Sequence, residues 1–245
     1  MKPSPAMLAA AAAAFAAGCC GMCNETTRSE NVRTEGLAAH ITVEAKSARE
    51  TFVSAKLRVG GPLSNLYPEI GGSDRLEAVN GADTVALTLS KHLLGAMTYD
   101  GALPGDSGGR TVAMRFLRVT NTSALGTHVD MPASFAVTSP AEDDHFSAAR
   151  PSLVVTWAPP LPGSITWVVR GSCIFDQSGG APDDGGRLPI VLAAAPAPDG
   201  GAPRTSCKVT ILLERTARGV VDPAFGEGGS ITATQTRERS VWFAP

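Results

Sequence analysis

Residues 76–90, LEAVNGADTVALTLS, indicate the fold class of this chain. Apolar side chains occupy every second position from Val85 to Leu89, which is the period of a half-buried strand. Asn80-Gly81 stands between two such runs, and this dipeptide is the strongest short hairpin signal, because both turn residues must adopt positive φ. The stretch therefore predicts two antiparallel strands joined by a tight turn.

The same alternation recurs along the chain, whereas no convincing amphipathic helix pattern does. Gly, Pro, Asn and Asp separate the alternating runs at spacings typical of a β-sandwich or barrel. We therefore predict an all-β protein with strands in the following segments: 41–46, 53–59, 76–79, 84–90, 111–119, 134–138, 153–157, 164–171, 188–193, 206–214 and 230–243, the last with a break.

Composition limits the class of protein further. The 245 residues are 43% hydrophobic and 18% charged, and the net charge is −2. These values exclude a disordered polyelectrolyte and a basic nucleic-acid binder. Gly (26) and Pro (18) are abundant but lack the period of collagen. The composition therefore predicts a folded body, with no nucleic acid as its partner.

The N-terminal segment reads as an export signal. Lys2 is its only charge, and the apolar run 7–17 is shorter than the roughly 20 residues that a membrane span needs. The run ends in Ala16-Ala17-Gly18-Cys19, which resembles a bacterial lipobox. That resemblance implies removal of residues 1–18 and a lipid anchor on Cys19. Ordinary secretion with cleavage after Ala16, and a buried Ala-rich helix, are the alternatives.

Cysteine parity favours the lipid anchor. The chain has five cysteines, and an odd number leaves one reactive thiol in an exported protein. Lipidation of Cys19 leaves an even four. By resemblance to lipoprotein sorting, Cys20 at the next position implies the outer membrane of a bacterial cell envelope. The polar segment 24–36 carries no core pattern, so we expect residues 19–36 to be a flexible tether.

The remaining chain is expected to form two antiparallel β-sandwich modules, residues 37–131 and 132–245. A boundary at 121–126, or one continuous sandwich, are the alternatives. The strand 135–140, FAVTSP, followed by 153–157, LVVTW, resembles the opening of bacterial immunoglobulin-like and fibronectin-like domains. The chain is also similar to lipoproteins of GC-rich Gram-negative bacteria. These resemblances imply a fold and an address but no activity.

One motif points to catalysis. Residues 105–109, GDSGG, match the nucleophile motif of trypsin-like serine proteases, with Ser107 as nucleophile and His40 or His92 as the candidate base. In that family the serine comes late, after most of both barrels, whereas here only 67 residues separate His40 from Ser107 and 138 follow it. We therefore expect a glycine-rich turn and no catalytic residue.

Two acidic segments could hold a divalent cation. They are 142–145, EDDH, and Asp183-Asp184. Neither has the ligand alternation of a known calcium loop, so both are expected to be solvated loops. We predict no metal and no cofactor, and a Ca²⁺-stabilised adhesion module using Asp143, Asp144 or Asp183 is the alternative.

The last two cysteines are predicted to pair. In the strand 164–171 every second side chain faces inward, and the next inward position after it is Cys173. In the strand 209–213 the inward position directly before Val209 is Cys207. Both thiols then lie in the buried phase of strands that can be neighbours. The sequence shows no combination of residues that forms a catalytic site, so these features favour a non-enzymatic structural or adhesive role. A serine hydrolase based on Ser107 is the alternative. The expected partner is another envelope protein.

Overall fold

The computed structural model describes residues 25–92, 96–196 and 206–245, in which β-strands are the main regular secondary structure and are joined by turns and loops. The described residues also contain two short 3-10 turns, η2 (Ser29–Asn31) and η3 (Thr34–Gly36). The all-β fold class is therefore confirmed. Within the described ranges, no helix has both the length and the apolar character needed to cross a bilayer.

The first module packs two sheets around one core. Its strands are β1 (Glu25–Arg28), β2 (Leu37–Ala45), β3 (Glu50–Val59), β4 (Leu66–Glu69), β5 (Arg75–Asn80), β6 (Asp83–Ala86), β7 (Thr88–Lys91), β8 (Met97–Pro104), β9 (Thr111–Leu117) and β10 (Ala124–Asp130). The sheet β10-β9-β5-β6 covers the sheet that contains β2, β3 and β8, and β1 pairs with β4 at one end.

The second module is an immunoglobulin-like sandwich. Its strands are β11 (Ala136–Ser139), β12 (His145–Ser147), β13 (Ser152–Ala158), β14 (Ser164–Gly171), β15 (Gln177–Pro182), β16 (Arg187–Val191), β17 (Cys207–Arg218) and β18 (Gly229–Ala244). The sheet β11-β13-β16 lies against β15-β14-β17-β18, and the strands cross repeatedly between the two layers, as in that fold.

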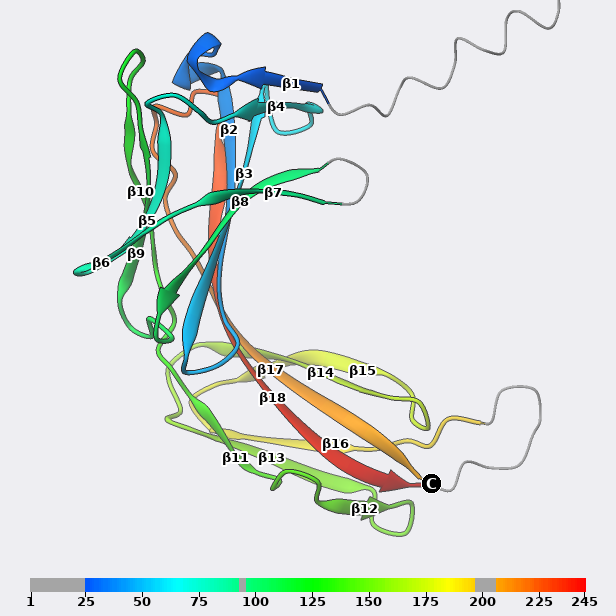
Figure 1. Cartoon of the computed structure of the whole chain (residues 1–245). Helices are drawn as coiled ribbons and strands as arrows, with labels where there is room; N and C mark the ends of the chain where they lie inside the picture. Colours follow the sequence, from blue (N-terminus) through cyan, green and yellow to red (C-terminus); the bar gives the residue numbers. More distant parts are fainter. Residues whose placement is uncertain (1–24, 93–95, 197–205) are drawn as a thin grey trace, which may run out of the picture.

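The hairpin β17–β18 runs through both modules (Figure 1). β18 pairs with β17 over residues 232–243 and in parallel with β2 over residues 229–235, so one sheet continues from β15 to β7. No break occurs in β18, contrary to expectation. Instead, the inward-facing apolar side chains of β18 fall into two separate groups. Ile231 and Ala233 belong to the first core, whereas Val241 and Phe243 belong to the second.

The C-terminal strands therefore complete both cores. The first core consists mainly of residues from 37–131, but Phe225 and Ile231 also belong to it. The second core lies wholly within residues 135–243. The two modules consequently share a hairpin in addition to the chain crossing near residue 132.

The hairpin predicted around Asn80-Gly81 forms between β5 and β6, but its turn lies one residue later than predicted. Asn80 pairs with Asp83, so the two turn residues are Gly81 and Ala82, and Gly81 has a φ of 62°. Glycine at the first turn position is typical of a type II′ turn. The strand predicted over 84–90 is divided: β6 pairs with β5 and β7 pairs with β8, so the chain changes sheets at the buried Leu87.

Several segments outside the predicted strands are ordered. Residues 25–36 were expected to belong to the tether, yet β1 pairs with β4 and the side chains of Ser29 and Thr34 are buried. The predicted strands also omit β4, β8, β10, β12 and the stretch 177–182, which forms β15 on β14. Gly179 lies opposite Trp167, and a Cβ there would come 3.0 Å from the indole, so this glycine lets the ring cover the strand.

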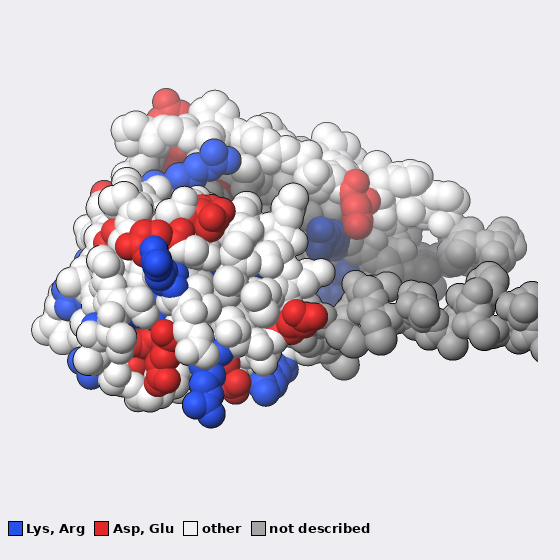
Figure 2. Space-filling model, turned by 90° about the horizontal axis from the view of Figure 1, so that it is seen from above, with Lys and Arg blue, Asp and Glu red and all other residues white. Residues whose placement is uncertain are grey.

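Charged side chains are dispersed over the end of the first module that carries β1 and β4. Lys and Arg are interspersed with Asp and Glu on this face, and uncharged residues occupy most of it (Figure 2). The face therefore offers no continuous basic stripe of the kind that tracks a phosphate backbone.

Candidate functional site at the module junction

Polar side chains gather where the long hairpin passes from one core to the other. The inward-facing positions of β17 and β18 are apolar within each core, but the positions between the cores are polar: Arg215 on β17 and Gln235, Arg237 and Arg239 on β18. Sequence reasoning missed this group. The interruption of a period-2 apolar phase inside two otherwise regular strands is the signal that marks it.

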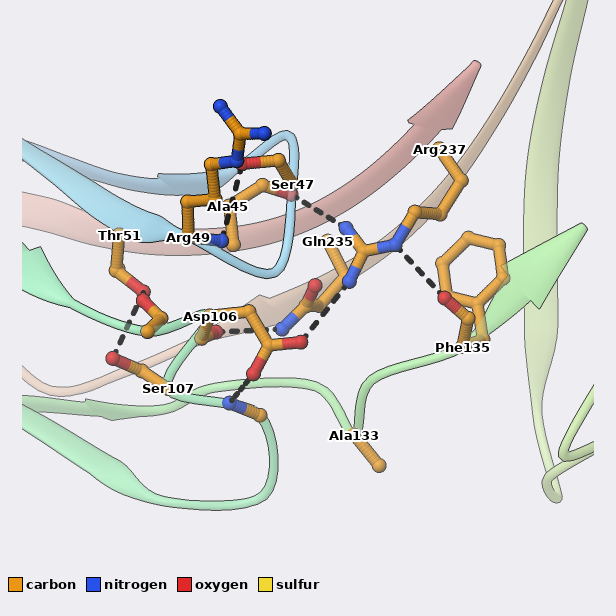
Figure 3. A network of polar contacts seen from close by, with 12 residues as sticks. Ala45, Ser47, Arg49, Thr51, Asp106, Ser107, Ala133, Phe135, Gln235 and Arg237 are labelled. Atoms are coloured by element: carbon orange, nitrogen blue, oxygen red, sulfur yellow. Dashed lines mark hydrogen bonds and ion pairs between the residues drawn. The ribbon is translucent and has the colours of Figure 1, made fainter. Parts of the chain in front are cut away.

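Arg237 ties three segments together (Figure 3). Its Nε donates a hydrogen bond to the carbonyl of Phe135 at 2.8 Å, and one terminal nitrogen donates to the carbonyl of Ala45 at 3.1 Å. The other terminal nitrogen donates to the carboxylate of Asp106 at 3.1 Å. Phe135 belongs to the second core, whereas Ala45 and Asp106 belong to the first module. One guanidinium therefore fixes the two modules to each other.

The GDSGG segment supplies the first module's side of this junction. The carboxylate of Asp106 accepts the N–H of Gly108 at 3.2 Å, and its carbonyl accepts Nε2 of Gln235 at 2.8 Å. Gly108 packs directly on Ser134, because a Cβ at Gly108 would overlap the Ser134 side chain. The motif therefore occurs here as a turn that contacts both β18 and the chain crossing between the modules.

Ser107 is buried in this turn with a φ of 51°. Its Oγ accepts hydrogen bonds from Thr51 Oγ1 and from Asn80 Nδ2, both at 2.8 Å. His40 and His92 each hydrogen-bond a different hydroxyl on the outer face of the sheet. Within the part of the chain that the structure describes, neither histidine reaches Ser107. The hydroxyl therefore lacks the adjacent base that activates a serine nucleophile.

The aromatic ring of Phe135 is shared by two arginines. The guanidinium carbon of Arg215 lies 4.5 Å from the ring centroid, and that of Arg237 lies 5.5 Å from it. Arg215 also forms a buried ion pair with Asp183, with N–O distances of 2.6 and 2.8 Å, and Trp157 Nε1 donates to the same carboxylate at 2.6 Å. Asp183, a candidate calcium ligand from the sequence, is therefore engaged inside the protein.

Two cations so close together influence each other. Burial lowers the pKa of Arg237 from its ordinary value, the Asp106 carboxylate raises it, and the positive charge of Arg215 lowers it again. The guanidinium still stays protonated, because arginine does not lose its proton in proteins. Asp106 and Asp183 thus balance two fixed positive charges at the junction.

The acidic residues of the 142–145 segment also have protein partners. Asp143 pairs with Lys208 at 3.4 Å, and Glu142 pairs with Arg239 at 3.5 Å. Asp144 accepts the N–H of Ala141 at 2.8 Å. Among the residues that the structure describes, no cluster of three His, Cys, Asp or Glu side chains is arranged to hold a metal ion.

The predicted disulfide is confirmed. Cys173 and Cys207 are bonded, with their Cα atoms 5.8 Å apart, and both are buried in the second core. The bond joins the end of β14 to the start of β17 and closes the segment that contains β15 and β16. The anchor candidate Cys19, like Cys20 and Cys23, lies outside the described residues.

Comparisons with known proteins yield a likeness at the level of solved structures. No family model matches the chain, and no curated protein does. A cytokine receptor complex shares 12% identity over 80% of this chain and 94% of that chain, with a TM-score of 0.28. A two-domain fibronectin type III segment of chicken tenascin shares 14% over 70% and 88%, with a TM-score of 0.20. Tandem Ig repeats of Dlar share 9% over 81% and 98%, with a TM-score of 0.24. Likeness this distant transfers neither a function nor an arrangement of modules.

Proposed function

We propose that this chain is a lipoprotein of the bacterial cell envelope. Cys19 anchors it to the outer membrane, and its two joined β-sandwich modules form a rigid, non-catalytic scaffold that holds another envelope protein. The observation that carries the scaffold part of the proposal is the hairpin β17–β18, which completes both cores and is held at the junction by Arg237.

The use of the GDSGG turn supports the non-catalytic part of the proposal. Ser107 accepts hydrogen bonds from Thr51 and Asn80, and the Asp106 carboxylate accepts hydrogen bonds from Arg237 and from the N–H of Gly108. The serine hydroxyl that a protease would expose to substrate is instead buried inside the protein. A fixed junction with buried polar contacts is what a spacer between two binding surfaces needs, because it holds both in one orientation.

The edge of the nine-stranded sheet supports the binding part of the proposal. β15 is the last strand at one end of that sheet, and its residues, QSGGAP, carry no charge. Edge strands usually carry charges, bulges or Pro that prevent pairing with other chains. In β15 only Pro182, the last residue of the strand, has such an effect, and the rest of the edge can accept a partner strand. Ser178 and Gly180 in this strand are exposed. We therefore place the partner contact on β15.

The anchor is tested by fractionating cells that make the full chain. The wild type is expected in the outer-membrane fraction, with an intact mass that lacks residues 1–18 and carries a lipid on Cys19. Cys19→Ala is expected to lose both the lipid and the membrane association. Cys20→Ala is the matched control and is expected to remain membrane-bound. An unmodified wild-type mass would refute the anchor.

The partner contact is tested by placing a photo-crosslinking amino acid at Ser178 on β15. Thr216, exposed on β17 in the middle of the same sheet, is the control position. Irradiation of intact cells is expected to give one discrete adduct from position 178 and none from position 216. Equal labelling at both positions, or none at 178, would refute the assignment of β15 as the binding edge.

A further inference from the structure

We infer that the loop between β3 and β4, residues 60–65, is a second contact with the lipid bilayer beside the anchor. This inference rests on the proposed anchor at Cys19. It adds an interaction surface on the folded body and an orientation: the β1–β4 end of the first module faces the membrane, and the second module points away from it.

The length of chain before the folded body sets the geometry. Because strand β1 begins at Glu25, the anchor residue Cys19 and the folded body are only six positions apart in the sequence, instead of the eighteen expected for a tether over 19–36. Six residues span at most about 20 Å when fully extended. The start of β1 must therefore lie within about 20 Å of the lipidated residue, whatever path the chain takes between them.

The β3–β4 loop lies directly beside this starting point. The N–H of Glu25 donates to the carbonyl of Asn65 at 3.2 Å, and β1 pairs with β4 from Leu66 onward. Figure 1 shows the loop next to the first residues of β1, at the end of the molecule opposite the C-terminus. A bilayer within reach of Glu25 is consequently within reach of the loop.

The loop presents an apolar side chain on an ordered turn. Its sequence is GGPLSN, without a charged residue, and Leu63 is 91% exposed, the highest value among the exposed large hydrophobic side chains. The N–H of Ser64 donates to the carbonyl of Gly61 at 3.2 Å, and Arg58 donates to the carbonyl of Pro62. These contacts hold Leu63 outward, and a lipid bilayer is the environment near the anchor that would bury it.

Electrostatics does not favour this contact over others. Lys and Arg are interspersed with Asp and Glu on this end of the molecule (Figure 2). The contact should therefore depend on apolar insertion beside the acyl chains and change little with salt, whereas a contact driven by basic residues would weaken as salt rises.

Tryptophan fluorescence can test the orientation, because Trp157, Trp167 and Trp242 all belong to the second module. The lipidated full chain is reconstituted into vesicles of phosphatidylethanolamine and phosphatidylglycerol with or without brominated acyl chains. The native emission should be unchanged by bromine. Leu63→Trp should add emission that falls by about half or more, since an interfacial side chain sits roughly 5–10 Å into the headgroup–acyl boundary.

The control variant is Phe175→Trp, which places an indole at a position that is 55% exposed in the second module. Its added emission should not be quenched. Unquenched Leu63→Trp emission in a protein whose mass shows lipid on Cys19 would refute the loop contact and leave the anchor intact. Quenching of the native tryptophans would refute the orientation. A mass without lipid on Cys19 would overturn both proposals.

Discussion

Arg237→Ala is expected to destabilise the protein and loosen the angle between its modules. The substitution removes the donors to the carbonyls of Phe135 and Ala45 and the ion pair with Asp106. Leaving a buried acceptor unsatisfied costs about 1–3 kcal/mol. Asp106 keeps the N–H of Gly108 and its carboxylate is 23% exposed, so its loss is small. We therefore expect the free energy of unfolding to fall by about 3 kcal/mol.

Arg239→Ala is the matched control, two positions further along the same strand. Arg239 donates to the carbonyl of Val137 at 2.7 Å and pairs with Glu142 at 3.5 Å, and both partners lie in the second module. The glutamate side chain is half exposed, so the expected loss is only about 1 kcal/mol. Arg239→Ala removes no contact between the modules, so the angle should not change.

Urea unfolding followed by circular dichroism measures the stability, and small-angle X-ray scattering measures the shape. Because both cores share β17 and β18, the wild type should unfold in a single transition. Arg237→Ala should shift the midpoint further than Arg239→Ala and should alone broaden the distribution of interatomic distances. Equal destabilisation by the two variants, with unchanged scattering from both, would show that Arg237 does not fix the junction.

Three further outcomes are expected. Cys173→Ser/Cys207→Ser should lose about 4 kcal/mol of stability in chemical denaturation, because the bond closes a sequence separation of 34 residues; a loss below about 1 kcal/mol would argue against a role for loop entropy. Ser107→Ala should lower the free energy of unfolding by about 1–2 kcal/mol, because Asn80 Nδ2 loses its hydrogen-bond acceptor. A fluorophosphonate probe should label neither the wild type nor the variant. Labelling that depends on Ser107 would instead support a hydrolase. Burial alone would raise the pKa of Asp222, but the backbone N–H groups that it accepts outweigh this and lower it. The stability this carboxylate adds is therefore lost as the pH falls below about 4, so Asp222→Asn should show a smaller drop in melting temperature between about pH 5 and pH 3 than the wild type does.

Strands with a regular alternation of apolar and polar side chains could be predicted, because their information is local. The inward positions of β9, Val112, Met114 and Phe116, are buried as the alternation requires. The Cys173–Cys207 bond followed from the same phase, since both cysteines continue the buried face of neighbouring strands. By contrast, Gly and Pro in 177–182 concealed β15, because an edge strand next to a large ring tolerates residues that a central strand does not.

The candidate site could not be predicted, because it is defined by contacts between distant segments. The bond from Arg237 to Asp106 spans 131 residues, and the bond to Ala45 spans 192. The local GDSGG match makes Ser107 a candidate nucleophile, whereas its hydroxyl bonds Thr51 and Asn80 inside the first module and its neighbour Asp106 bonds Arg237 at the junction. The only local signal was the presence of four polar residues at inward-facing positions of two strands. This signal indicates where an apolar core ends, but it does not indicate which residues the polar side chains contact.

By itself, the sequence determined that this protein is built from strands, which side chains face inward in strands with a regular alternation such as β9, and which cysteines can pair, because these properties depend on alternation within a few residues. Only the tertiary structure decided that β18 lies beside β2, more than 180 positions away in the chain, and that the two modules share a hairpin. Pairing between strands is set by burial of whole faces and by backbone hydrogen bonds. Many strands of the same chain could meet these two requirements for a given strand, and only the packing of the whole fold selects the one that pairs with it.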